Sequence, residues 1–207
     1  MVRLMLVTDD VLVRGRDLVA LALGAERGGA TSVQLRLKGA SARELVGAAR
    51  ALVGALRVPV LVNDRPDVAL AAGAAGVHLG PDDLPVVLAR KVAPPGFIIG
   101  ASAGSPEEAA ASAGADYWGV GPWRDTGTKA EAGAALGPNG LRRMVRESRG
   151  KPCIAIGGVR PEDIGAVLGE GAVGVAVVSG ILGQEDVEAA ARRYARALAV
   201  IPGKRGG

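Results

Sequence analysis

The sequence has a single cysteine, Cys153, and a single histidine, His78, among its 207 residues. One cysteine excludes an intramolecular disulfide, and its place in an apolar run predicts a small buried core residue. One histidine excludes metal sites built from several histidines and argues against a Ser-His catalytic triad. We expect His78 to be a core histidine with satisfied hydrogen bonds, and a general base is the alternative.

Aromatic residues make up only 2% of the chain, although 49% of its residues are hydrophobic. Ala, Val, Leu and Gly must therefore build the core, and such small side chains suit parallel strands that are covered by helices. No apolar run reaches the roughly 18 residues that a membrane helix needs, and the N-terminus lacks a signal-peptide pattern. We therefore expect a cytoplasmic protein without a membrane segment.

Neither sign of charge dominates: 25 Lys and Arg residues face 21 Asp and Glu residues, a formal net charge of +4. The basic residues are scattered among acidic ones and few aromatics accompany them, so the pattern is not that of a nucleic-acid-binding surface. We interpret the small positive excess as a preference for anionic small molecules or as a solubility feature.

Short apolar runs alternate with longer amphipathic segments, without a linker or a change in composition. The expected strands are 4–8, 32–37, 58–63, 76–79, 97–102, 117–121, 153–157 and 174–179. The expected helices include 17–27, 42–56, 67–72, 85–90, 106–113, 161–169 and 185–199. This pattern predicts a single compact (β/α)8 TIM barrel over residues 1–201, with a disordered tail at 202–207. A doubly wound open sheet is the alternative, although the first crossover lacks a dinucleotide-binding fingerprint.

In such a barrel the functional groups lie at the carboxyl ends of the strands. Gln34, Arg36 and Lys38 alternate with apolar residues, so the period of two places them on one face of a strand, toward the barrel interior or toward the helices. Two cations and an amide on one face need partners, which a bound polyanion would supply. A polar layer closed by internal salt bridges is the alternative.

Carboxylates follow the next two strands, in Asn63-Asp64 and in Asp82-Asp83. Because adjacent strands lie about 4.8 Å apart, carboxylates from both could share one cation. A small set of oxygen ligands suits Mg²⁺, which keeps several waters and binds substrate phosphates. The alternatives are local: Asp64 pairs with Arg65 or caps a helix, and Asp83 caps the helix that follows it.

Residue types that bind phosphate follow the last three expected strands. Residues 121–129 read GPWRDTGTK, and the hydroxyls of Thr126 and Thr128 with the ammonium of Lys129 suit phosphate oxygens. A solvated loop with a helix-capping threonine is the alternative. Gly157-Gly158 and Ser179-Gly180 follow strands seven and eight, the usual position of a phosphate site in a barrel.

Taken together and in this order, these motifs resemble those of the thiamine-phosphate synthase family. The resemblance runs from Val33 to Ile181 through VQLRLK, LVNDRPDVAL, GVHLGPDDLP, IGAS, GADY, GPWRDTGTK, AIGGV and VAVVSGI. It implies a transferase on a (β/α)8 barrel. Such an enzyme joins hydroxymethylpyrimidine pyrophosphate to a thiazole phosphate, or to its carboxylated form, and releases pyrophosphate and thiamine monophosphate.

The resemblance also implies a role for each matching residue. The pyrimidine pyrophosphate would be held by Gln34, Arg36, Lys38, Asn63, Ser102 and Lys129; the thiazole phosphate by Thr126, Thr128, Gly158, Val178 and Ser179; and Mg²⁺ by Asp64 and Asp83. Arg36, Lys38 and Lys129 would be catalytic, because they stabilise the departing pyrophosphate, and the reaction needs positioning more than a general base. The partners are then two phosphorylated small molecules, and a homodimer is expected because many small barrels dimerise.

The chain departs from the family pattern at three places: Pro81 replaces a usual glutamine, Gly104 a common histidine, and Arg124-Asp125 a more apolar pair. None of them removes an implied phosphate or metal ligand. A related thiazole tautomerase and a non-catalytic sensor of phosphorylated ligands are the alternatives. The tautomerases rely on a histidine where this chain has Gly104, and a sensor needs no paired metal carboxylates, so both features favour the synthase.

Overall fold

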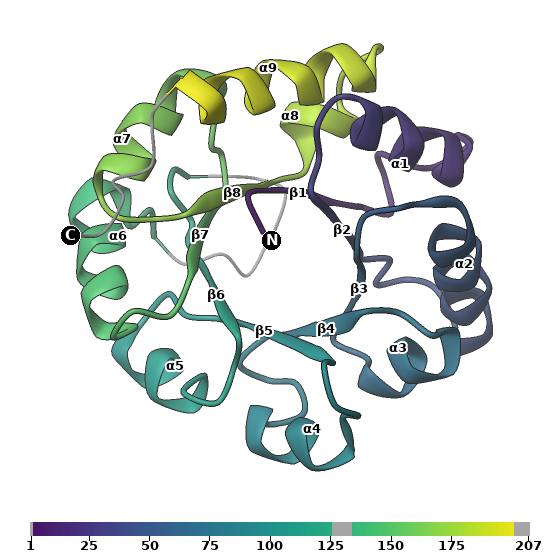
Figure 1. Cartoon of the computed structure of the whole chain (residues 1–207), viewed down its shortest axis with the longest axis horizontal. Helices are drawn as coiled ribbons and strands as arrows, with labels where there is room; N and C mark the ends of the chain where they lie inside the picture. The colour runs from purple at the N-terminus through teal and green to yellow at the C-terminus, as the bar shows by residue number, and fades with distance from the viewer. Residues whose placement is uncertain (1, 126–133, 201–207) are drawn as a thin grey trace.

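The computed structural model describes residues 2–125 and 134–200, which form a closed barrel of parallel strands surrounded by helices (Figure 1). The strands are β1 (Leu4–Val7), β2 (Ser32–Leu35), β3 (Val60–Asn63), β4 (Gly76–Leu79), β5 (Ile98–Ser102), β6 (Tyr117–Val120), β7 (Cys153–Ile156) and β8 (Gly174–Val177). Each strand pairs with its neighbour in chain order, and β8 closes on β1 with Met5 opposite Ala176. The predicted TIM barrel is confirmed, and the open sheet is wrong.

Helices cover the outside of the barrel on all sides (Figure 1). They are α1 (Leu18–Arg27), α2 (Ala42–Ala55), α3 (Pro66–Ala72), α4 (Val86–Val92), α5 (Pro106–Ala111), α6 (Gly137–Glu147), the 3-10 turn η1 (Pro161–Asp163), α7 (Ile164–Gly169), α8 (Ser179–Leu182) and α9 (Val187–Val200). All the expected helices are present with small shifts at their ends, whereas α6 and α8 were not expected. Among the residues described, none of the helices has the length and apolar character needed to cross a membrane.

Side-chain caps fix where several helices begin. The Asp17 carboxylate accepts hydrogen bonds from backbone N–H groups in the first turn of α1, and the Ser105 hydroxyl does the same in α5. Ser41 and Glu44 form a reciprocal capping box at the start of α2. Each cap satisfies N–H groups that have no partner inside the helix. The local sequence therefore determines the starts of these three helices.

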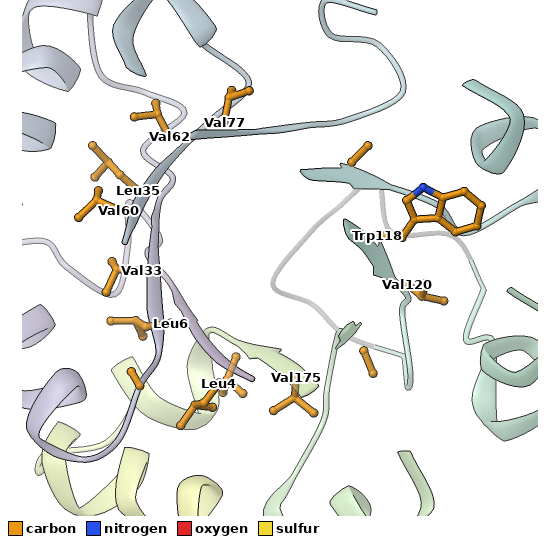
Figure 2. Packing of buried hydrophobic residues seen from close by; sticks show 14 of the residues in the cluster. Leu4, Leu6, Val33, Leu35, Val60, Val62, Val77, Trp118, Val120 and Val175 are labelled. Atoms are coloured by element: carbon orange, nitrogen blue, oxygen red, sulfur yellow. The ribbon is translucent and has the colours of Figure 1, made fainter. Parts of the chain in front are cut away.

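Alternation along the strands separates two apolar layers. Leu4 and Leu6 of β1 point away from the barrel axis, into the layer beneath the helices (Figure 2). Met5 and Val7, the residues between and after them, belong to a smaller cluster inside the barrel that also contains Tyr117. The outer layer is built largely from Ala, Val and Leu, as the composition predicts, and the inner cluster forms the floor below the strand ends.

Cys153 lies in the outer layer and is buried, which confirms its expected role in the core. Burial raises the pKa of its thiol above the ordinary value. A buried thiol with a raised pKa is a poor nucleophile at neutral pH, so Cys153 has no place in the chemistry of the site.

Candidate active site

A cavity of about 510 Å³ opens at the carboxyl ends of the strands, a volume typical of small-molecule sites. Ten of the residues that the sequence singled out line it: Gln34, Arg36, Lys38, Asn63, Asp64, Asp83, Ser102, Gly158, Val178 and Ser179. The other three, Thr126, Thr128 and Lys129, lie outside the described residues. The structure thus brings all the described candidates into one cavity, whereas their individual roles stay predictions.

The basic wall of the cavity comes from β2 and the loop that follows it. β2 ends at Leu35, so Arg36 and Lys38 lie beyond the strand, and Gln34, at 3% exposure, faces the barrel interior. Arg36 Nη1 lies 3.6 Å from Asp9 Oδ2, and Lys38 Nζ lies 4.0 Å from Asp64 Oδ2. Both cations thus line the cavity, where the oxygens of an anionic ligand could bind them.

The loop after β1 holds this wall in place, a contribution that the sequence analysis missed. The Thr8 hydroxyl accepts from the Arg36 N–H at 2.8 Å and donates to the Arg36 carbonyl at 3.1 Å. The Asp10 carboxylate accepts from the N–H groups of Lys38 and Gly39 at 2.9 Å and 3.1 Å. The position of Thr8 and Asp10 directly after the first apolar run was the only signal that could have indicated them.

Asp64 and Asp83 meet at the rim of the cavity. Burial raises the pKa of the Asp64 carboxyl to about 6, and a hydrogen bond to Asp83 together with its negative charge acts in the same direction. Asp64 has a φ of 66°, a left-handed conformation that is uncommon outside glycine, and its N–H donates to the His78 carbonyl at 2.8 Å. Asp83 Oδ2 accepts from the Gly80 N–H at 2.6 Å. These backbone contacts hold two carboxylates side by side.

The local alternatives for these carboxylates are wrong. Arg65 pairs with Asp67, its Nε lying 2.8 Å from Asp67 Oδ1. α3 and α4 begin without a side-chain cap, so neither Asp64 nor Asp83 caps them. Two adjacent, partly buried carboxylates leave an excess of negative charge that a divalent cation would neutralise.

The donor set at this rim fits Mg²⁺ rather than a softer metal. The described residues contain no group of three or more His, Cys, Asp and Glu side chains that could hold a metal ion. A cation held by Asp64 and Asp83 would therefore take its remaining ligands from water and from substrate phosphate, which is how Mg²⁺ commonly binds.

His78 lies inside the barrel beneath the cavity and is 8% exposed. Its Nδ1 lies 2.9 Å from the Tyr117 hydroxyl, and its Nε2 lies 3.3 Å from the Ser102 hydroxyl. The expected core histidine with satisfied hydrogen bonds is what the structure shows, although its ring also lines the cavity. Burial raises the pKa of Tyr117, so its hydroxyl stays protonated and can donate. The sequence analysis assigned no role to Tyr117, although this residue ends the GADY motif of the resemblance and the alternation along its strand places it inside the barrel.

The opposite corner of the cavity is built from the glycines after β7. Gly157 and Gly158 have φ values of 89° and 68°, which L side chains rarely adopt. A Cβ at Gly157 would lie 2.7 Å from Pro122 Cβ, and one at Gly158 would lie 3.0 Å from Arg124 Cβ. Only glycine therefore lets the loops after β6 and β7 pack this closely beside Ser179.

Two of the departures from the family pattern have a structural explanation. The Arg124 guanidinium donates to the Asp163 carboxylate, with Nε 3.1 Å from Oδ2, and so ties the loop after β6 to η1. Burial opposes ionisation of Asp163, but Arg124 and the Arg160 N–H hold its pKa below the ordinary value. A Cβ at Gly104 would lie 2.8 Å from the Gly121 carbonyl oxygen, so a histidine would not fit there without a shift of the backbone.

A closed barrel with a cavity at its strand ends that is lined by both cations and carboxylates defines the class: a TIM-barrel enzyme with a small-molecule site. Residues 4–181 match the family model described as thiamine monophosphate synthase, and the chain belongs to this family.

Named relatives span nearly the whole chain. A thiamine-phosphate synthase of Methanospirillum hungatei JF-1 is 48% identical over 197 residues, covering 93% of this chain and 95% of the relative. One of Xanthobacter autotrophicus is 48% identical over 200 residues, covering 94% of each. Among solved structures, a thiamine phosphate pyrophosphorylase from Pyrococcus furiosus has a TM-score of 0.86 at 38% identity and covers 96% of both chains. A 3-hexulose-6-phosphate synthase, with a TM-score of 0.71 at 21% identity, shares the fold alone.

Proposed function

We propose that this chain is a thiamine-phosphate synthase. It joins 4-amino-2-methyl-5-hydroxymethylpyrimidine pyrophosphate to 4-methyl-5-(2-phosphoethyl)thiazole, or to its carboxylated form, and releases pyrophosphate. The observation that carries the proposal is a cavity at the strand ends that is lined both by Arg36 and Lys38 and by the carboxylate pair of Asp64 and Asp83. A pyrophosphate leaving group needs both: cations for its oxygens and carboxylates for its metal ion.

Departure of pyrophosphate is the step that the basic wall supports. The carbon–oxygen bond to the pyrimidine methylene breaks, and the electron pair leaves with the pyrophosphate. Arg36 and Lys38 stabilise the developing negative charge through charge-assisted hydrogen bonds. Lys129 is expected to do the same from the segment outside the described residues. Mg²⁺, held by Asp64 and Asp83, would supply further positive charge at these oxygens.

Capture of the resulting pyrimidine cation by the thiazole nitrogen requires positioning more than proton transfer. Gln34, Asn63 and Ser102 would hold the pyrimidine part. The thiazole phosphate would be held at the glycine corner by Gly158, Val178 and Ser179, with Thr126 and Thr128 from outside the described residues. No step takes a proton from the substrate, which agrees with a His78 that is already engaged by Tyr117 and Ser102.

A coupled assay with both phosphorylated substrates tests the proposal. We expect thiamine monophosphate and pyrophosphate in equal amounts with Mg²⁺, and loss of turnover with excess EDTA. Asp64→Ala and Lys129→Ala should each abolish coupling while the far-UV circular dichroism spectrum stays unchanged. Asp67→Asn, which removes a carboxylate from an exposed ion pair outside the cavity, is the control and should keep normal turnover. Near-normal turnover in Asp64→Ala or Lys129→Ala would contradict the assigned roles.

The tautomerase alternative has little structural support, because the Gly121 carbonyl leaves no room for a side chain at Gly104. Incubation with the carboxylated thiazole phosphate alone checks this, since a tautomerase would convert it without the pyrimidine substrate. The sensor alternative predicts binding of one substrate without any coupling.

We further propose that the enzyme works in the cytoplasm and forms a homodimer. The free, buried thiol of Cys153 is compatible with a reducing compartment. Light scattering coupled to gel filtration would give the assembly state directly.

A further inference from the structure

Hydrogen bonds link three side chains in the barrel interior just below the cavity: Tyr117 on β6, His78 on β4 and Ser102 on β5. We propose that Tyr117 is a positioning residue that acts through His78. Its hydroxyl fixes the His78 tautomer, and His78 in turn makes the Ser102 hydroxyl a donor toward the pyrimidine. The part that concerns the pyrimidine rests on the proposed function, whereas the tautomer is a property of the protein alone.

The strand register places these hydrogen-bonded residues in two adjacent levels of the barrel. His78 pairs with Gly100, and Gly100 pairs with Tyr117, so all three share one level. Ser102 pairs with Gly119 in the level above, nearer the cavity. His78 can therefore contact Tyr117 across Gly100 and reach up to Ser102.

Two glycines leave the space that the rings occupy. A Cβ at Gly100 would overlap the Tyr117 ring and its hydroxyl, and a Cβ at Gly119 would lie 3.0 Å from His78 Cε1. Neither glycine has a positive φ, so neither is required by its backbone conformation. Gly100 of β5 and Gly119 of β6 thus provide the space that the rings of Tyr117 and His78 occupy inside the barrel.

The direction of the hydrogen bonds follows from what each group can donate. The Tyr117 side chain is 1% exposed, so its hydroxyl proton needs an acceptor inside the barrel. The structure places His78 Nδ1 2.9 Å from that hydroxyl, and a ring nitrogen can accept. Tyr117 therefore donates its proton to His78 Nδ1.

A neutral imidazole whose Nδ1 accepts must carry its proton on Nε2. The Nε2–H then donates to the Ser102 oxygen at 3.3 Å. Because that oxygen accepts from below, the Ser102 proton remains available for an acceptor atom of a ligand in the cavity. At this point the cavity would favour a ligand that places an unprotonated ring nitrogen against the Ser102 hydroxyl. It would disfavour a ligand with an N–H or C–H group in the same position.

Nitrogen-15 NMR of the imidazole tests the tautomer, and His78 is the only histidine, so its signals need no assignment. At a pH where the ring is neutral, we expect an unprotonated Nδ1 and a protonated Nε2 in the substrate-free enzyme. Tyr117→Phe should shift the equilibrium toward the Nδ1–H form. Tyr194→Phe is the matched control: it removes the other tyrosine hydroxyl, which donates to the Val159 carbonyl, and should leave the His78 signals unchanged.

Ser102→Ala shows whether the His78 tautomer is set by the hydrogen bond to Tyr117 or by the one to Ser102. If Tyr117 sets it, the Nε2–H form persists in Ser102→Ala, and this result stands even if Tyr117→Phe is too unstable to study. An Nδ1–H form in the wild type, a switch in Ser102→Ala, or unchanged signals in Tyr117→Phe would each overturn the proposal.

Steady-state kinetics test the positioning role. Tyr117→Phe should raise KM for the pyrimidine pyrophosphate about 2- to 12-fold, the range for loss of one neutral hydrogen bond, and leave KM for the thiazole phosphate unchanged. Equal effects on both KM values would indicate a merely structural role and overturn the proposal. If the wild type showed the expected tautomer but no coupling, the proposed function would fail and the Tyr117–His78 relation would stand.

Discussion

Asp64 combines two unfavourable features, a left-handed backbone and a second carboxylate against its own. Its pKa of about 6 in the folded protein lies above the ordinary value of 3.8. Between these two values the folded protein binds a proton that the unfolded chain has already lost. The free energy of unfolding of the metal-free protein must therefore fall as pH rises from about 4 to about 6, and it stays lowered above that range.

Asp64→Asn should remove this cost. Asparagine keeps the size of the side chain and tolerates a positive φ, so we expect the metal-free variant to be more stable than the wild type at pH 7.5, by about 1–3 kcal/mol. Near pH 4 the difference should vanish, because Asp64 is then protonated in the wild type. Urea unfolding in EDTA at both pH values measures it.

Asp67→Asn is the control for this comparison. Its carboxylate pairs with Arg65 at the surface, and the hydrogen bond from Arg65 lowers its pKa. Its loss should reduce stability at pH 7.5 by less than about 1 kcal/mol. A destabilised Asp64→Asn at pH 7.5 would show that the Asp83 contact is favourable without a cation.

Some of these residue-level features could be predicted from the sequence and others could not. Asp64 and Asp83 were predictable because they follow neighbouring strands, and such strand ends converge in a parallel barrel. Tyr117 was not, because its role depends on space left by Gly100 on another strand and on the ring of His78. The contact between Tyr117 and His78 depends on how β4, β5 and β6 are aligned with one another, and the local sequence of one strand does not show this alignment.

At the scale of elements, all eight strands were predicted, but five of them, β1, β2, β6, β7 and β8, were predicted too long at their carboxyl ends. β2 was expected to continue to residue 37 and ends at Leu35. The reason is that the Arg36 N–H donates to the Thr8 hydroxyl and not to a backbone carbonyl of β1. Polar and apolar side chains continue to alternate beyond Leu35, although the backbone hydrogen bonds between the strands have ended. The sequence pattern therefore predicts a strand that is too long where the site begins.

α6 was missed for a different reason. Its first turn contains glycine, proline and asparagine, and a second glycine follows, so local propensity argues against a helix. Leu141 and Met144 nevertheless bury one face against the barrel. Packing overrides propensity in this helix, and α8, with four residues, is too short to show a period.

The start of α2 gives a prediction at this scale. Ser41 Oγ accepts from the Glu44 N–H at 3.3 Å, and Glu44 Oε2 accepts from the Ser41 N–H at 2.8 Å. Ser41→Ala should lower the free energy of unfolding by about 1 kcal/mol, whereas Ser41→Thr should cost less because threonine also caps. Thermal unfolding of the three proteins would show this order. A drop in Ser41→Thr as large as in Ser41→Ala would mean that the capping hydroxyl is not what stabilises this end of the helix.

At the scale of the whole molecule, the barrel closes where β8 meets β1. The count of alternating strands and helices predicted a closed barrel, but the closing register was not predictable because it joins the two ends of the chain. Gly174 is essential to this seam: a Cβ there would overlap the Arg3 carbonyl oxygen. The atom that a Cβ would meet belongs to the backbone of Arg3, so a change of side-chain rotamer cannot relieve the overlap.

Gly174→Ala should therefore destabilise the protein by about 1–3 kcal/mol, the range for overpacking a tight interior. Gly47→Ala is the matched control, since Gly47 lies on the exposed side of α2 with nothing near its missing Cβ. We expect that change to stabilise the protein by about 0.5–1 kcal/mol. Equal stability of Gly174→Ala and the wild type in urea unfolding would contradict this account of the seam.

The central claim is that one cavity at the strand ends brings the reacting groups of both substrates together. A crystal structure of the enzyme with thiamine monophosphate, pyrophosphate and Mg²⁺ tests it most directly. The account predicts pyrophosphate against Arg36 and Lys38, Mg²⁺ between Asp64 and Asp83, and the thiamine phosphate beside Gly158 and Ser179. Products bound elsewhere on the barrel, or pyrophosphate without contact to Arg36 and Lys38, would contradict it.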